Sequence, residues 1–372
     1  MKRTNNNFKV ILLTLTLMLC TLSISGADEL VQMAILLDTS GSMDGLIDQA
    51  KAQLWKIVNE LALAKKNGKS VSLEVGLYEY GNDGIPATEG HLRMIVNLTK
   101  DLDKISEELF KLTTNGGSEY CGQVIDAATG TLNWSKSNND LKIIYIAGNE
   151  PFTQGSLDYK SACSNAIKKG IIVNTIFCGD YKEGISTFWK HGADLADGKY
   201  INIDQNQKTV HIDTPYDEEI VKLGNELNKT YLAYGSLGTT NKSRQEKQDL
   251  NASTMSEEAL VQRSISKAQS QYVNSSWDLL DAVENGMINL EEMEDEELPE
   301  ELKGKSDKEI EEYIKNMQKE REKIQKEINE LNEKRRKYVA KEMEKIASED
   351  TLDSAIIKSV REQATKKHFA FE

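Results

Sequence analysis

Three mainly apolar runs, at residues 31–37, 141–146 and 171–177, limit what this chain can fold into. Each run has the length of a β-strand, and none alternates regularly between apolar and polar residues. A strand of this kind is buried on both faces, which occurs where helices cover both sides of a parallel sheet. The three runs therefore predict the centre of an α/β sheet.

Two further segments, 71–77 and 92–98, alternate as half-exposed strands do. We expect them near one edge of the sheet, paired as a hairpin across the loop 81–90. A last short strand is expected at residues 199–204, and helices fit between the strands. The predicted helices span residues 46–65, 102–113, 122–134, 157–169 and 185–196. This order predicts a doubly wound α/β domain with a mostly parallel central sheet.

The first apolar run ends at a short motif, Asp38-x-Ser40-x-Ser42, just before a helical pattern. In an extended loop these alternate side chains lie on one face, so a carboxylate and two hydroxyls can converge on one point. Gly41 allows a close approach of the backbone between them. Hard oxygen ligands of this type bind divalent cations, although short Ser-rich loops also cap helices.

Several segments in the same order resemble the von Willebrand factor type A (VWA) domain over roughly residues 30–235. Besides the motif that begins at Asp38, the matching segments are residues 75–81, 109–112 with 116–118, 169–176 and 197–200. The resemblance implies a Rossmann-like doubly wound domain. It also implies a metal-ion-dependent adhesion site built on the loop after the first strand.

The family's remaining metal ligands are only partly matched. The resemblance places Ser118 where the family has a ligand Thr, and serine keeps the hydroxyl oxygen. Where the family has an Asp, this chain offers Asn149 or Gly148, depending on how the loop is aligned. With one carboxylate fewer the site should hold its cation more loosely, so an intact and a vestigial site are both open. Oxygen-only ligands favour Mg²⁺ or Mn²⁺.

For function, the resemblance implies a non-enzymatic protein-binding module. In such modules an acidic side chain of the partner protein fills an open coordination position on the cation. The four histidines are scattered, and the sequence suggests no Ser, His and Asp arrangement for catalysis. The alternative is a structural envelope or scaffold protein whose metal site is vestigial and whose C-terminal helices drive assembly.

The N-terminus has the pattern of an export signal. Lys2 and Arg3 precede a short apolar core, and small residues follow up to Ala27. We therefore expect residues 1–27 to be a secretory signal peptide and the mature protein to be periplasmic or secreted. Cys20 offers a lipoprotein alternative, but Leu19 occupies the position where a lipobox has a small residue. No later segment is apolar enough to span a bilayer.

Three cysteines remain when Cys20 is removed, an odd number for an oxidising compartment. Cys178 follows a predicted central strand at the sheet edge that carries the metal loops, and Cys163 lies about one turn into the preceding helix. These two are candidates for a disulfide, with Cys121 left free. The alternative is that both are buried free thiols.

The formal net charge of the chain is -14. Nucleic acids and anionic membranes both require a basic face on the proteins that bind them. The charge therefore argues against either as a partner.

Beyond about residue 235 the composition shifts toward Glu, Lys and Gln. We predict a VWA domain at 28–235, a linker and a first helix at 236–305, and a long helix with a short terminal helix at 306–372. The linker is expected to begin with a hinge at residues 235–241, where Gly, Ser and Thr are concentrated. The whole extension is predicted to be helical.

The long helix carries a narrow apolar stripe with alternating spacings of four and three residues. Its members are Ile310, Ile314, Met317, Arg321, Ile324, Ile328, Leu331, Arg335 and Tyr338. This is the pattern of a coiled-coil seam with two arginine interruptions, and such a seam must pack on another helix. The partner is either the earlier helix that contains Val261 and Ile265, in a helical hairpin, or a second copy of the chain, in a homodimer. The long connection at 291–304 favours the hairpin.

Overall fold

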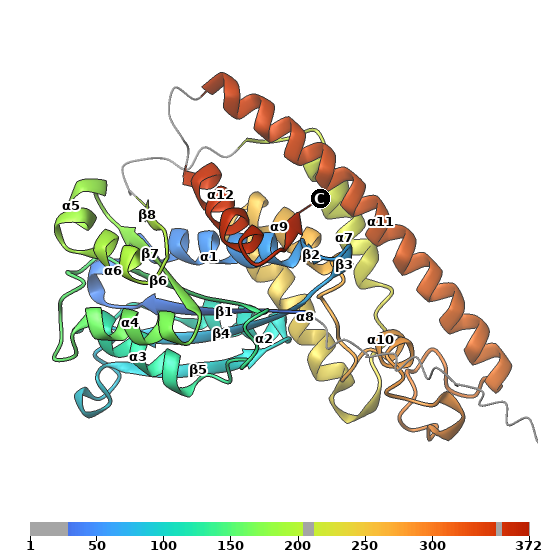
Figure 1. Cartoon of the computed structure of the whole chain (residues 1–372). Coiled ribbons are helices and arrows are strands. Elements are labelled where there is room, and N and C mark those ends of the chain that lie inside the picture. Colours follow the sequence, from blue (N-terminus) through green and yellow to red (C-terminus); the bar gives the residue numbers. More distant parts are fainter. Residues whose placement is uncertain (1–28, 204–211, 347–351, 372) are drawn as a thin grey trace, which may run out of the picture.

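The computed structural model describes residues 29–203, 212–346 and 352–371, so the predicted signal peptide lies outside the described residues. Its centre is a six-stranded sheet (Figure 1). In sheet order the strands are β5 (Leu92–Thr99), β4 (Ser72–Tyr80), β1 (Leu30–Asp38), β6 (Leu141–Gly148), β7 (Ile171–Cys178) and β8 (Tyr200–Ile203). Only β4 and β5 pair antiparallel, which confirms the predicted α/β fold with a mostly parallel sheet.

The strands occupy the positions that their patterns predicted. The three mainly apolar runs became β1, β6 and β7, and the alternating segments became the antiparallel pair that ends at the β5 edge. Side chains of β1 divide between the two faces of the sheet: Ile35 and Leu37 join one hydrophobic cluster, and Ala34 and Leu36 join the other. Burial on both faces therefore explains why this strand does not alternate.

One face of the sheet is covered by helices from within the domain. They are α3 (Cys121–Thr131), α4 (Tyr159–Lys168) and α6 (Trp189–Leu195). A single helix was predicted at residues 185–196, but the structure has α5 (Tyr181–Ser186) followed by α6. The break is at Phe188, whose backbone has a φ of 71°, a left-handed conformation that no helix continues through.

The opposite face is covered jointly by the domain and by the C-terminal part of the chain. Helices α1 (Ile47–Ala62), α2 (Leu102–Lys111), α7 (Asp217–Asn228), α9 (Glu257–Lys267) and α12 (Leu352–Thr365) contribute to one continuous hydrophobic cluster with β1. Figure 1 shows α9 and α12 lying near α1. The C-terminal helices thus pack on the domain and do not project from it as a stalk.

The segment 235–241, expected to be a hinge, is instead the beginning of α8 (Gly235–Met255). Tertiary contacts outweigh its weak helical propensity. Gln245 donates a hydrogen bond to the hydroxyl of Tyr272, and Ser106 of α2 donates one to Gln248. Both glutamines are fully buried, so polar contacts hold this mostly polar helix against the domain.

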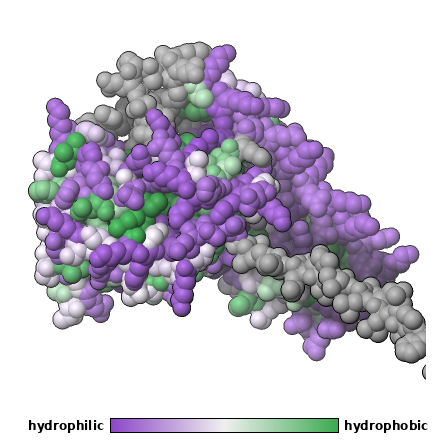
Figure 2. All heavy atoms as spheres, in the orientation of Figure 1, coloured by the Kyte–Doolittle hydropathy of each residue, from purple (hydrophilic) through white to green (hydrophobic). Residues whose placement is uncertain are grey.

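The long helix is α11 (Asp307–Ile346), and the predicted seam is its buried face. Ile324 and Ile328 enter the main hydrophobic cluster, and Ile310 and Ile314 pack with the short helix α10 (Leu279–Glu284). Helix α11 packs mainly against α7, and also against α9 and α10 of the same chain. Figure 2 shows the hydrophilic side chains along its outward face.

The two arginines that interrupt the seam are buried and paired. Arg321 donates hydrogen bonds to both carboxylate oxygens of Asp278 at 2.6 and 3.2 Å and to the Thr230 carbonyl at 2.6 Å. Its guanidinium also lies 4.2 Å from the ring centroid of Tyr231. These contacts fix the position of α11, because a buried guanidinium needs its hydrogen-bond partners in specific positions.

The second arginine, Arg335, joins the first turns of two other helices. It donates to Asp217 of α7 at 2.7 Å and to Glu258 of α9 at 2.8 Å. Acidic residues are favourable in the first turn of a helix, and here they also form ion pairs with Arg335 of α11. The interruptions in the apolar seam are therefore the groups that position the helix.

The end of the described chain also returns to the domain. The strand β9 (Ala370–Phe371) pairs antiparallel with β2 (Ala64–Lys66), which pairs in turn with β3 (Lys69–Ser70). Phe369 is buried, with the Lys66 ammonium 4.7 Å from its ring centroid. Within the described ranges, no helix combines the length and the apolar composition that a bilayer span requires.

The predicted Cys163–Cys178 disulfide is not present, because both residues are free thiols in the structure. Cys163 belongs to the hydrophobic cluster on one face of the sheet and Cys178 to the cluster on the other face. Cys121 is also buried and free. The sheet separates the two residues that the sequence suggested as a pair, so they pack as small apolar side chains.

Replacing Arg321 by Met should destabilise the protein by about 3–5 kcal/mol, because Asp278 would remain buried without its counter-charge. Urea unfolding followed by circular dichroism measures the change. Lys323→Ala, at a position whose side chain is 74% exposed, is the matched control and should change the free energy of unfolding by less than about 0.5 kcal/mol. Equal stability of the two variants would contradict the positional role of Arg321.

Thiol labelling should distinguish the buried free thiols from the predicted disulfide. Burial raises the pKa of the Cys163 thiol to about 12 and raises those of Cys121 and Cys178 as well, so none is a reactive thiolate in the native state. In protein that lacks residues 1–27, a maleimide without reductant should label none of these cysteines natively and all of them in denaturant. Labelling of only one in denaturant would contradict the structure.

Candidate metal site

The site is built on Asp38, the last residue of the central strand β1. Its side chain is completely buried, and parallel pairing with β4 sets it beside Tyr80. One carboxylate oxygen, Oδ1, accepts a hydrogen bond from the backbone N–H of Ser40 at 2.8 Å. The other oxygen, Oδ2, is buried and has no hydrogen-bond partner. An unpaired buried carboxylate oxygen is costly, so this atom is the feature of the site that best fits a bound cation.

Two glycines lie directly against this carboxylate. A Cβ on Gly148, the last residue of β6, would lie 2.9 Å from Asp38 Oδ2. A Cβ on Gly81, just after β4, would lie 2.5 Å from Asp38 Oδ1. Gly81 also has a φ of 78°, which favours glycine on backbone grounds alone. The two neighbouring strands thus end in residues without a side chain, which lets their backbones pack directly against the buried carboxylate.

Burial raises the pKa of Asp38 from its ordinary value to about 7. Hydrogen bonds from Ser40 act in the opposite direction, and the nearby carboxylate of Glu119 raises the pKa further. The charged form is therefore disfavoured in the absence of a counter-ion. A divalent cation beside Asp38 would remove this penalty.

A row of hydroxyl groups leads from Asp38 to the surface along the turn η1 (Gly41–Met43). The hydroxyls of Ser40 and Ser42 lie 2.9 Å apart, with Ser40 buried and Ser42 exposed. Ser42 Oγ donates to Asn149 Oδ1 at 2.9 Å, and Asn149 Nδ2 donates to the Ser42 carbonyl oxygen at 2.9 Å. The structure therefore sets Asn149, and not Gly148, against the serine loop.

Ser118 lies in a loop that is attached to the serine motif through the backbone. The N–H of Gly41 donates to the carbonyl of Gly116 at 3.0 Å, and the N–H of Asn115 donates to the carbonyl of Thr39 at 2.9 Å. Ser118 follows in this loop and is half-buried. Loops after β1, β6 and α2 thus meet at the carboxyl ends of the parallel strands, where ligand sites of α/β sheets are found.

Glu119 is a further acidic residue at the site that sequence analysis did not select. Its side chain is 5% exposed, and it interacts with the hydroxyl of Ser40 and with the charge of Asp38. Burial raises the pKa of Glu119, and the charges of Glu150 and Asp83 add to this effect. Its position directly after Ser118 was the only available signal, because no pattern indicates that a glutamate there is buried.

The donor set fits a hard divalent cation. In the described part of the chain, no three His, Cys, Asp or Glu side chains form a group that could hold a metal by themselves. A cation here would therefore depend on hydroxyl oxygens in addition to the charge of Asp38. Ligands of this composition suit Mg²⁺ or Mn²⁺ better than softer metals.

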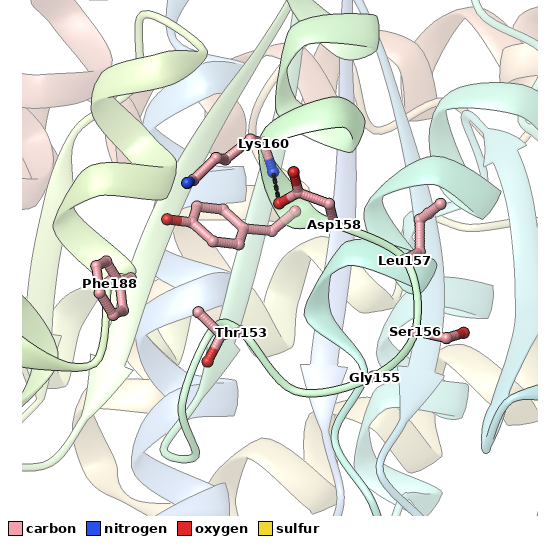
Figure 3. A pocket seen from close by; sticks show the side chains of 8 residues that line it. Thr153, Gly155, Ser156, Leu157, Asp158, Lys160 and Phe188 are labelled. Carbon is pink, nitrogen blue, oxygen red and sulfur yellow. Dashed lines mark hydrogen bonds between the residues drawn. The ribbon is translucent and has the colours of Figure 1, made fainter.

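A pocket of about 410 Å³ lies on the loop that follows Asn149 (Figure 3). Thr153, Leu157, Tyr159 and Phe188 line it, and Figure 3 shows Phe188 and Leu157 on opposite sides. The Tyr159 hydroxyl lies 2.7 Å from His191 Nδ1, which holds the phenol in place. The pocket is open and shallow, and we assign it no ligand.

Comparison with known proteins identifies the domain. The model of the von Willebrand factor type A domain family matches residues 32–187. No curated protein sequence gives a match.

The solved structures that this chain is similar to share little sequence with it. BatB from Bacteroides thetaiotaomicron is 17% identical, with 47% of this chain and 90% of that chain covered and a TM-score of 0.36. The SpRpn10 VWA domain is 15% identical, with 48% and 89% covered and a TM-score of 0.37. Proximal thread matrix protein 1 from the mussel byssus, described with a zinc-occupied MIDAS motif, is 12% identical, with 49% and 43% covered and a TM-score of 0.36.

The family model begins within β1 and ends just after α5, so it includes Asp38, both serines of the motif, Ser118 and Asn149. The strand order and the loops at the carboxyl ends of the strands agree with it. The chain therefore contains a von Willebrand factor type A domain, at residues 32–187, followed by a helical C-terminal region.

Proposed function

We propose that this protein is a non-enzymatic, divalent-cation-dependent binding module exported from the cell. Asp38, Ser40 and Ser42 would hold Mg²⁺ or Mn²⁺, with Ser118 and Asn149 completing the site. The bound cation would supply a Lewis-acidic position that accepts a carboxylate oxygen of a partner protein. Export is proposed from the N-terminal signal pattern alone.

One observation carries this proposal. Asp38 Oδ2 is fully buried, has no hydrogen-bond partner and packs so closely on Gly148 that a Cβ there would lie 2.9 Å away. A purely structural aspartate would have both oxygens satisfied, because an unpaired one lowers stability. Binding of a cation would explain why a buried carboxylate oxygen is left without a partner in this protein.

The Ser42–Asn149 contact explains how the site can be open at the surface. Ser42 is exposed and its hydroxyl is oriented by Asn149, whereas Asp38 and Ser40 are buried beneath it. A cation on these oxygens would be anchored from below and reachable from solvent. This arrangement suits an acidic side chain that approaches from outside, which we propose as the partner's contribution.

The alternative, a scaffold protein that assembles through its helical extension, has less support. The apolar stripe of α11, which suggested a coiled coil with a second chain, is covered within the same chain: Ile324 and Ile328 lie in the main cluster with α7 and α9, and Ile310 and Ile314 pack with α10. The hydrophilic outward face of α11 offers no comparable apolar seam (Figure 2).

Binding of the cation should raise the melting temperature of the wild-type protein. At a metal concentration of about 100 times Kd, Mg²⁺ or Mn²⁺ should add about 2.7 kcal/mol to the free energy of unfolding. Asp38→Asn should abolish this gain, because it removes the anionic ligand. In chelator the variant should melt at or above the wild-type temperature. Burial raises the pKa of Asp38 in the folded state to about 7, so the metal-free wild-type protein loses stability as the pH rises above about 4, where Asp38 ionises in the unfolded chain. Asparagine carries no such charge.

Differential scanning fluorimetry with and without EDTA makes this measurement. Asp48→Asn is the matched control, since Asp48 is exposed near the start of α1 and should keep the full metal response. An unchanged melting temperature of the wild-type protein at millimolar Mg²⁺ and Mn²⁺ would leave the alternative scaffold function in place of the proposed one.

Partner binding should follow the cation. Wild-type protein used as bait on a native envelope extract should retain a partner in Mg²⁺ or Mn²⁺ and lose it in EDTA, and Asp38→Asn should fail to retain it under either condition. Retention of the same partner by the Asp38→Asn bait would show that binding does not use the metal site.

A further inference from the structure

We propose that Glu119 is a direct carboxylate ligand of the cation held by Asp38. This inference rests on the proposed metal site and adds a residue to it. It makes the site one with two protein carboxylates, although the sequence pattern predicted only one.

The geometry brings the two carboxyl-bearing side chains to one place. The point where a Cβ on Gly81 would lie is 2.5 Å from Asp38 Oδ1, 3.1 Å from Glu119 Cγ and 3.4 Å from Ser40 Cβ. A side chain at position 81 would collide with Asp38, so glycine is what lets these three residues approach one another closely. The two acids come from loops far apart in sequence, and the absence of a Cβ between them permits their approach.

Close packing of the backbone at residues 116–119 against Gly81 positions Glu119 beside Asp38. A Cβ on Gly117 would lie 1.5 Å from the carbonyl oxygen of Gly81, so only glycine allows this contact. Gly117 has a φ of 125°, a conformation that also requires glycine. The N–H of Glu119 then donates to Gln154 Oε1 at 3.1 Å, which fixes the residue from the opposite side.

Within the described part of the chain, the charges that act most strongly on Glu119 are acidic. The neighbouring charges that act on it are Glu150 and Asp83, and it in turn acts on Asp38. All three are acidic, and no ion pair to Glu119 is formed among the described residues. A glutamate that is 5% exposed beside a completely buried aspartate is a pair of acids whose charged forms a cation between them would stabilise.

An independent observation indicates where that cation belongs. Asp38 Oδ2 has no partner although the residue is 0% exposed, so the protein by itself does not satisfy this carboxylate. The Ser40 hydroxyl interacts with both Asp38 and Glu119. A divalent ion coordinated by the two carboxylates and this hydroxyl would satisfy all three groups together.

A second carboxylate changes what the site can bind. Two protein carboxylates neutralise a divalent cation, which compensates for the neutral Asn149 at the position where the family has an acid. The cation should therefore bind without a partner protein present. Its attraction for a partner's carboxylate should correspondingly be weaker than at a site with one protein carboxylate.

Manganese binding to the purified protein tests this inference directly. Electron paramagnetic resonance of free Mn²⁺ gives the number of sites and the dissociation constant for each variant. Glu119→Gln should weaken Mn²⁺ binding at least tenfold, because loss of a direct ligand should cost no less than loss of an outer partner. Glu119→Asp, which keeps the charge but shortens the reach, should also weaken it by several-fold or more.

The control removes an equal charge at a more exposed position. Asp83→Asn, whose side chain is 57% exposed, should change the dissociation constant by less than about threefold, since only a screened long-range effect is lost. Equal losses in Glu119→Gln and Asp83→Asn, or wild-type affinity in Glu119→Gln, would overturn the assignment while leaving the proposed function intact. Absence of Mn²⁺ binding in the wild-type protein would overturn both. Melting temperatures in EDTA confirm that each variant is folded.

Discussion

A fully buried carboxylate at the end of the central strand is the constraint around which the functional edge of this domain is organised. Asp38 has one oxygen held by the backbone of Ser40 and the other left without a partner. Such a group is tolerated only where the surrounding loops leave room for a counter-ion. The glycines at positions 81 and 148 let the neighbouring strand ends pack closely on this carboxylate, and the serine and Gly-Gly loops are hydrogen-bonded to each other beside it.

The fold explains why these loops meet. In a parallel sheet the carboxyl ends of neighbouring strands lie at one edge, so the residues after β1, β4 and β6 are adjacent in space although they are far apart in the chain. The antiparallel strand β5 is confined to the edge and leaves this arrangement undisturbed. The site is therefore a consequence of strand order combined with the residue chosen at each strand end.

The C-terminal helices stabilise the face of the sheet remote from the α3, α4 and α6 layer. Apolar residues of α9, α11 and α12 share one cluster with β1, so this region is part of the same core as the strand that carries Asp38. Buried ion pairs of Arg321 and Arg335 set the position of α11. Ion pairs of this kind add little net stability compared with apolar packing, but they are strongly selective for one arrangement.

Much of this could be predicted from the sequence, because the relevant signals are local. Apolar runs of strand length, alternation at the edge strands and the stripe on α11 each report burial directly, and Asp38-x-Ser40-x-Ser42 places three oxygens on one loop.

What the tertiary structure decided is which distant groups meet. Glu119 approaches Asp38 only because Gly81 and Gly117 allow two backbones to touch, and Asn149, not Gly148, faces Ser42 because of how β6 ends. The sheet separates Cys163 from Cys178, and α7 and α9 cover a seam that by its pattern could equally have paired with another chain. Local periodicity records whether a side chain is buried, whereas its partner depends on contacts between segments that no local pattern encodes.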